Sequence, residues 1–117
     1  MVRIAEFHTR QTAGYDAKAI LQNQGYEVAK VLLRSTNKPG KIGLIAWNRL
    51  EMLFVCIRSY RGRFHLQEDI DALSLLHRSG AYPGEIQYWV RQKSGWIRYR
   101  ICSGGAIRLR GSDDASS

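Results

Sequence analysis

The sequence lacks the features that mark membrane and secreted proteins. None of its 117 residues belongs to an uncharged apolar run that approaches the length of about 18 residues expected of a transmembrane helix. The first six residues contain no long apolar segment of the kind that directs a chain to secretion. These two absences predict a cytoplasmic protein that does not span a membrane.

Cysteine is also scarce. The two cysteines, Cys56 and Cys102, both lie in apolar segments, and neither has a Cys or His neighbour at the spacing of zinc ligands. A structural disulfide is not expected in a reducing compartment. Both side chains are therefore predicted to be small buried hydrophobic groups, and the sequence predicts no metal site and no cofactor.

Acidic residues are few: 10 Asp and Glu stand against 18 Lys and Arg, which gives a net charge of +8. Asp113 and Asp114 lie in the C-terminal tail, so residues 1–111 carry 18 basic and 8 acidic residues, or +10. Most of the basic residues are Arg, whose planar guanidinium donates paired hydrogen bonds to phosphate. The imbalance favours a nucleic-acid partner. The alternatives are an acidic protein partner and a surface charge that only confers solubility.

Length and composition indicate one small globular domain. An apolar fraction of 44% is enough to build a hydrophobic core in a chain of this length. Residues 112–117 contain no apolar side chain larger than Ala and are predicted to be disordered. The domain is therefore expected to comprise residues 1–111.

Two helices are predicted from apolar spacing and end signals. The first runs from an N-cap at Thr12 to about Gln24, and Gly25 ends it. The second runs from about Gln67 to His77 and ends at Gly80. Its first turn contains acidic residues that favour the helix dipole, and its buried stripe is expected to comprise Ile70, Leu73, Leu76 and His77.

Five strands are expected between and after these helices, in the order α-β-β-β-α-β-β. This order fits an α/β domain with a mixed five-stranded sheet flanked by helices. The first three strands are expected to be neighbours, with both helices packed on the sheet. The predicted strands are Tyr26–Arg34, Ile42–Trp47, Met52–Arg58, Glu85–Arg91 and Gly95–Cys102.

Two apolar strands carry the pattern of a nuclease metal-site hairpin without its carboxylates. The matching segments are Gly40–Ala46 and Phe54–Arg58, which overlap the predicted strands Ile42–Trp47 and Met52–Arg58. With Gly14–Leu21 as first helix and Gly25–Val28 as the entry to the first strand, the chain resembles the restriction-endonuclease-like, PD-(D/E)xK nuclease superfamily. The most similar members are archaeal Holliday junction resolvases and small bacterial nuclease-like proteins. The resemblance covers about residues 13–102 and implies the fold of that superfamily.

The resemblance also implies the positions of four chemical roles. The helix-one carboxylate maps to Asp16, and the first metal-binding aspartate maps to Gly43, which has no ligand. The second acidic ligand maps to Cys56, a soft thiol ill suited to Mg²⁺, and the catalytic lysine maps to Arg58. One carboxylate cannot hold and activate a hydrolytic metal well. The site is therefore expected to be degenerate and the chain to lack catalysis.

Basic and aromatic residues follow the third predicted strand and recur on the last one. An Arg can bind a phosphate, and an aromatic ring can stack on an unpaired base. Arg98 and Arg100 are expected on the same face of the last strand. The candidate nucleic-acid-binding residues are Lys38, Lys41, Arg58, Tyr60, Arg61, Arg63, Arg98 and Arg100.

Three functional hypotheses remain open from the sequence. The first is a non-catalytic domain that binds DNA, with homodimerisation as a further expectation. The second is an active Mg²⁺-dependent endonuclease or Holliday junction resolvase whose ligands have migrated, with Asp16 joined by Glu51, Glu68 or Glu85. The third is a structural module that binds an acidic protein.

Overall fold

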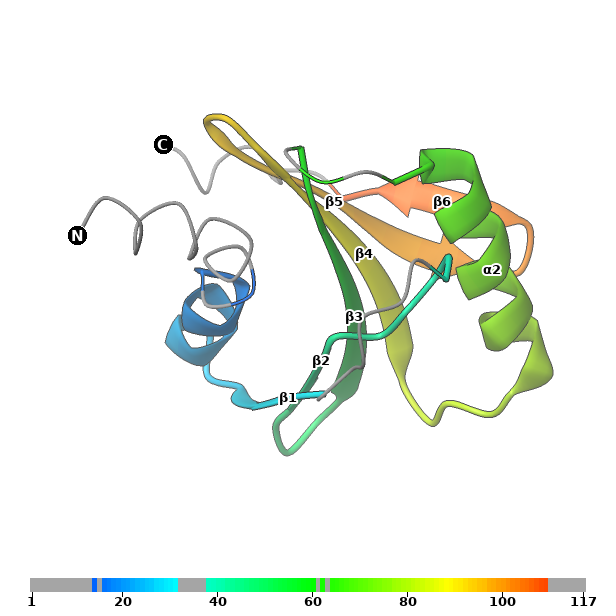
Figure 1. Cartoon of the computed structure of the whole chain (residues 1–117). Helices are drawn as coiled ribbons and strands as arrows, with labels where there is room; N and C mark the ends of the chain where they lie inside the picture. Colours follow the sequence, from blue (N-terminus) through cyan, green and yellow to red (C-terminus); the bar gives the residue numbers. More distant parts are fainter. Residues whose placement is uncertain (1–13, 15, 32–37, 61, 63, 110–117) are drawn as a thin grey trace.

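The computed structural model describes residues 14, 16–31, 38–60, 62 and 64–109. They form a six-stranded sheet with a helix on each face (Figure 1). The predicted N-cap Thr12, the end of the first predicted strand and the tail 112–117 lie outside the described residues. Within the described part of the chain, no helix is long and apolar enough to cross a membrane.

The strands lie in the sheet in the order of the sequence, β1-β2-β3-β4-β5-β6. All neighbours are antiparallel except β3 and β4, which are parallel, so the sheet is mixed, as predicted. The prediction that the first three strands are adjacent is confirmed. The strands are β1 (Glu27–Lys30), β2 (Leu44–Trp47), β3 (Met52–Ser59), β4 (Glu85–Gln92), β5 (Gly95–Cys102) and β6 (Gly105–Arg108).

Strand β6 is the difference from the five strands that the sequence predicts. It forms an antiparallel hairpin with β5, in which Cys102 pairs with Gly105 and Tyr99 with Arg108. The strand has four residues and includes a Gly and an Ala, so it lacks the run of β-branched and aromatic residues that signals a strand. Its formation depends on the free edge of β5, which only the folded sheet provides.

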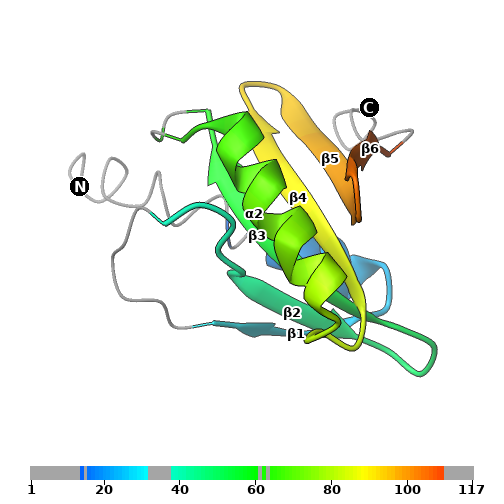
Figure 2. The same ribbon diagram turned by 90° about the vertical axis from the view of Figure 1, so that its right-hand side faces the viewer.

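The helices cover opposite faces of the sheet (Figures 1 and 2). The N-terminal helix includes residues 16–23, and Gly25 follows it with a positive φ of 95°. Helix α2 (Leu66–Ser79) connects the parallel strands β3 and β4, which need such a crossover. Gly80 ends α2 in the left-handed conformation, with φ 69°. Both predicted helix ends are therefore confirmed.

The core consists of two apolar clusters separated by the sheet. Alternate residues of β3 supply them: Leu53 and Val55 pack with the N-terminal helix, and Phe54 and Cys56 pack with α2. His77 was expected in the buried stripe of α2, and this prediction is wrong. The whole last turn of α2, residues 77–79, is exposed, because the helix extends past its last apolar contacts.

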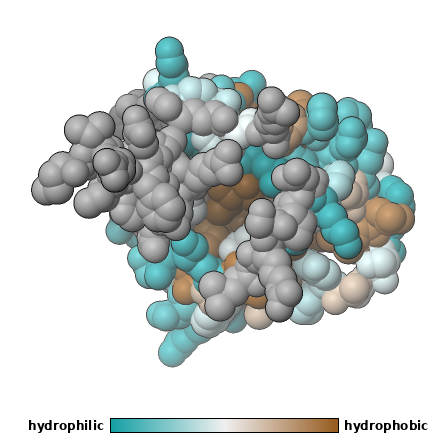
Figure 3. All heavy atoms as spheres, in the orientation of Figure 1, coloured by the Kyte–Doolittle hydropathy of each residue, from teal (hydrophilic) through white to brown (hydrophobic). Residues whose placement is uncertain are grey.

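The surface seen in Figure 3 is hydrophilic over most of its periphery, and apolar side chains show at the bottom of a central hollow. Such a distribution is normal for a small domain whose apolar groups are divided between two cores.

Candidate functional site

One end of the sheet contains the four positions that the resemblance assigns to chemistry. The amide of Gly43 donates a hydrogen bond to the carbonyl of Val55 at 2.8 Å, which continues the register that pairs Leu44 with Val55. Gly43 therefore lies opposite Cys56. Cys56 precedes Arg58 on β3 by two residues. In the parallel pairing of β3 with β4, Ser59 lies opposite Arg91, so the C-terminal end of β4 lies at this same end of the sheet.

A buried polar cluster takes up the side of this sheet end that faces α2. Its centre is the carboxylate of Asp69, in the first turn of α2, which is 1% exposed. Arg58 donates to it from Nε at 3.0 Å and from a terminal nitrogen at 2.8 Å. The Tyr88 hydroxyl donates at 2.6 Å, and the amide of Gly40 donates at 2.8 Å. We call Asp69, Arg58, Tyr88 and the Gly40 amide the Asp69 cluster.

The Asp69 cluster saturates its carboxylate. Each oxygen of Asp69 accepts two hydrogen bonds, which uses the four lone-pair sites of an ionised carboxylate. Burial alone would raise the pKa of Asp69, but the hydrogen bonds from Arg58, Tyr88 and Gly40 outweigh it and lower the pKa. The hydrogen bond with Asp69 also raises the pKa of Arg58, against the opposing effect of burial. The result is a fixed internal ion pair with no carboxylate lone pair left for a cation.

Gly40 allows the chain to approach α2 closely enough to join this cluster. Its φ is +66°, a conformation that favours glycine. A Cβ atom at this position would lie 2.7 Å from the Cβ of Ala72 and 3.2 Å from the amide nitrogen of Leu73. The segment before β2 therefore packs directly against the first half of α2, and this contact is possible because Gly40 has no side chain.

The two strand positions to which the resemblance assigns metal ligands have different environments. Cys56 is fully buried in the apolar cluster under α2, and burial raises the pKa of its thiol to about 12. The thiol is therefore neutral near pH 7 and acts as a small hydrophobic group, as the sequence predicts. Among the described residues, a Cβ at Gly43 would meet only the carbonyl oxygen of Val55 within 4 Å, at 3.9 Å.

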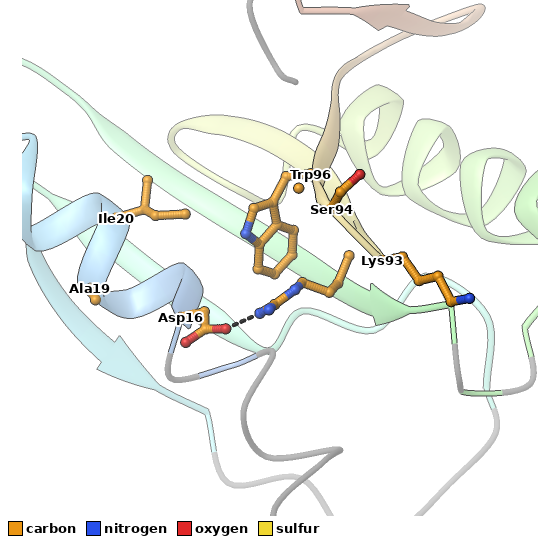
Figure 4. A pocket seen from close by; sticks show the side chains of 8 residues that line it. Asp16, Ala19, Ile20, Lys93, Ser94 and Trp96 are labelled. Atoms are coloured by element: carbon orange, nitrogen blue, oxygen red, sulfur yellow. Dashed lines mark hydrogen bonds and ion pairs between the residues drawn. The ribbon is translucent and has the colours of Figure 1, made fainter. Parts of the chain in front are cut away.

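Asp16 lies on the other face of the sheet. It forms an ion pair with Arg91 near the end of β4 (dashed line in Figure 4). Arg91 is opposite Ser59 of β3, so this pair sits at the same sheet end as the Asp69 cluster but on the side of the N-terminal helix. At this end of the sheet each helix thus contributes one aspartate, and each aspartate is bound by a strand arginine.

The structure does not bring together the carboxylates considered for a migrated metal site. Glu51 hydrogen-bonds to Tyr26, Glu68 is exposed on α2, and Glu85 accepts a hydrogen bond from Gln87 at the opposite end of β4. Among the residues that the structure describes, no group of three or more His, Cys, Asp or Glu side chains could hold a metal ion. Asp16 is therefore not part of such a group within the described chain.

Two members of the Asp69 cluster were missed in the sequence. Asp69 was assigned to the helix dipole, and Tyr88 was read as part of an apolar strand. With Leu73 and Leu76, Asp69 forms the i, i+4, i+7 pattern of a helix face, but Glu68 forms the same pattern with Ala72 and Leu75, so spacing alone does not single out the buried carboxylate. No signal marks the Tyr88 hydroxyl either.

The candidate nucleic-acid-binding residues are divided between this sheet end and β5. The carbonyl of Lys38 accepts a hydrogen bond from Arg58, and the amide of Tyr60 donates to the carbonyl of Arg91 at 2.9 Å, which places both residues at the sheet end. Lys41 precedes β2 there, half-buried, whereas Arg61 and Arg63 lie outside the described residues. Arg98 and Arg100 lie on β5, opposite Trp89 and Gln87, on the face of the N-terminal helix.

Acid should weaken the fold through Asp69. Its pKa is lower in the folded protein than the value of about 3.9 expected in the unfolded chain. The unfolded chain then binds more protons, so the stabilisation is lost as the pH falls through the folded pKa. We expect the free energy of unfolding to drop below about pH 4 in the native protein, and to drop less in Asp69→Asn. Urea unfolding followed by circular dichroism at several pH values measures this, and an equal drop in both proteins would contradict it.

Comparisons with known proteins identify the fold. No protein-family model matches the sequence, and no curated protein sequence matches it significantly. The structure is similar to that of Hjc, a Holliday junction resolvase from the archaeal hyperthermophile Archaeoglobus fulgidus, with a TM-score of 0.58 and 10% sequence identity. The similarity covers 92% of this chain and 99% of the resolvase chain. The chain therefore has the restriction-endonuclease-like nuclease fold that the sequence predicts.

Proposed function

We propose that this domain binds DNA and has lost the metal-dependent hydrolysis of nucleases that share its fold. The observation that supports the loss most strongly is the Asp69 cluster. Arg58 lies on β3, the strand to which the resemblance assigns the second metal ligand and the catalytic lysine. In the cluster its guanidinium is bound by the carboxylate of Asp69, which has no free lone pair. An internal cation thus stands beside the positions where a nuclease of this fold would bind a metal.

Binding is supported by the charge and by where the fold places it. The chain has a net charge of +8. At one end of the sheet two ion pairs, Arg58 with Asp69 and Arg91 with Asp16, balance their charges, and Lys38 and Lys41 add positive charge beside them. The first turn of α2 lies at this end too, so the positive end of its dipole adds to the potential. Because the similar fold is that of a Holliday junction resolvase, a four-way junction is the first branched DNA to test beside linear duplex. Homodimerisation stays a prediction that sedimentation analysis can test.

DNA affinity should fall steeply with salt. Each phosphate neutralised on duplex DNA contributes about −0.9 to the slope of log K against log salt concentration. We expect Lys38→Ala and Arg100→Ala each to weaken binding and to reduce the magnitude of that slope by about one, with little change of sequence preference. Anisotropy titrations of labelled duplex and four-way-junction DNA at several salt concentrations measure both effects.

The matched control is Arg49→Ala. Arg49 is exposed in the β2–β3 turn, at the sheet end opposite to Lys38 and on different strands from Arg100 of β5, so this variant loses the same charge away from both tested positions. Equal effects of Arg49→Ala, Lys38→Ala and Arg100→Ala would indicate only non-specific attraction. No binding at low salt would contradict the proposal and would favour an acidic protein as the partner.

A cleavage assay tests the loss of catalysis. We expect no Mg²⁺-dependent hydrolysis of linear or branched DNA, because the strand positions of the metal ligands are Gly43 and a buried neutral Cys56. Hydrolysis that required Mg²⁺ and disappeared in Asp16→Ala would contradict the proposal and would restore the active-endonuclease alternative.

A further inference from the structure

Strands β4 and β5 present alternating cationic and aromatic side chains on the face of the N-terminal helix. Arg91 lies directly opposite Trp96, and Trp89 lies directly opposite Arg98. The guanidinium carbon of Arg91 is 5.6 Å from the centre of the Trp96 ring, and that of Arg98 is 5.0 Å from the Trp89 ring. Both are cation–π contacts, which fix the arginine side chains over the sheet. Arg100 is the next residue on this face of β5 and is exposed.

A pocket of about 550 Å³ adjoins this face, between the N-terminal helix and the β4–β5 hairpin. Figure 4 shows Ala19 and Ile20 on the helix side and Trp96 on the strand side, with Ser94 and Lys93 at the hairpin. The pocket is therefore lined by apolar and aromatic side chains, by the Asp16–Arg91 ion pair and, at the hairpin, by the cationic Lys93. The volume lies in the range of about 300–1,000 Å³ that is usual for small-molecule sites.

Arg98 is an incompletely satisfied cation on the same face. Its Nε atom is buried and has no hydrogen-bond partner among the described residues. Burial also lowers the pKa of Arg98, because a desolvated guanidinium loses the hydration of its charge. An anion bound at the accessible part of this side chain would offset that loss. Lys93 and Arg100 lie on either side of Arg98 along the hairpin, so negative charge at this face would meet a row of three cations.

We propose that this face binds an unpaired nucleotide of a DNA strand, with its base in the pocket and its backbone phosphates along Lys93, Arg98 and Arg100. A base offers a flat apolar group to Ala19, Ile20 and the part of Trp96 that borders the pocket, and the attached phosphate offers the anion that the cations require. A base inside a duplex is stacked between its neighbours, so only an unpaired base can place its face against this wall. This inference rests on the proposed function and adds a second surface, on the other face of the sheet from the Asp69 cluster.

The test compares two DNA duplexes that differ in one unpaired base. One duplex is fully paired, and the other carries a single unpaired 2-aminopurine, whose fluorescence is quenched when it stacks. We expect about ten-fold tighter binding of the second duplex and quenching on binding, as one base–aromatic contact provides. Equal affinity for both duplexes without quenching would overturn this inference and leave the proposed function standing. No binding of either duplex would overturn both.

A charge-matched pair of variants locates the site. Ala19→Glu places a carboxylate at the pocket from an exposed helix position, so it should abolish both the preference and the quenching while the protein stays folded. Gln22→Glu adds the same charge on the same helix, at an exposed position that does not line the pocket, and should retain both. Thermal unfolding confirms that each variant folds. Equal behaviour of the two variants would overturn the assignment of the pocket.

Discussion

Replacement of Asp69 by Ala should lower the free energy of unfolding by about 3–5 kcal/mol. The substitution leaves the largely buried guanidinium of Arg58 without its counter-charge, and it removes the acceptor of the Tyr88 hydroxyl and of the Gly40 amide. A buried charge that loses its partner keeps its full desolvation cost, and each orphaned donor adds its own. Urea unfolding followed by circular dichroism at neutral pH measures the loss.

Glu68→Ala is the matched control for this prediction. Glu68 precedes Asp69 in the same turn of α2 and carries the same charge, but its side chain is exposed. We expect its removal to change the free energy of unfolding by no more than about 0.5 kcal/mol. If both variants lost the same stability, the helix dipole rather than the Asp69 cluster would account for the effect, and the structural interpretation of Asp69 would be wrong.

Gly84→Ala should destabilise the fold by about 3 kcal/mol or more, because it forces an atom into the start of the parallel strand pair. A Cβ at Gly84 would lie 2.2 Å from the carbonyl oxygen of Met52 and 2.9 Å from its carbonyl carbon. The obstacle is backbone, so it cannot be relieved by a side-chain rotation. Relief would require β3 and β4 to separate where Leu53 pairs with Glu85. Thermal unfolding measures the effect.

Gly104→Ala serves as the comparison. Gly104 lies in the β5–β6 turn, and a Cβ there would meet no atom of the described part of the chain within 4 Å. This variant should therefore unfold close to the native protein. A Gly84→Ala protein of native stability would contradict the close approach of Gly84 to the Met52 carbonyl.

The two Asp–Arg pairs at one sheet end connect the stability of the domain with its proposed function. Arg58 and Arg91 neutralise Asp69 and Asp16, so the aspartates do not repel a phosphate backbone that approaches this end. The same pairing holds both helices to the strands beside the proposed binding surface.

Local sequence determined much of this architecture. Side chains alternate between the two faces of a strand, so the residues of β3 face the N-terminal helix and α2 in turn. Gly25 and Gly80 determine where the two helices end. The charge of +8 and the absence of ligands at Gly43 and Cys56 are likewise properties of the sequence alone. These features could be predicted because each depends on neighbours within a few residues.

Tertiary structure decided what each charged group does. Arg58 and Asp69 are 11 residues apart and Asp16 and Arg91 are 75 apart, and local periodicity does not indicate which carboxylate meets which arginine. The same holds for β6, which needs the open edge of β5, and for the pocket, whose two walls come from the helix and the hairpin. Pairings over such separations depend on how helices and strands are placed on the sheet, so only the assembled fold specifies them.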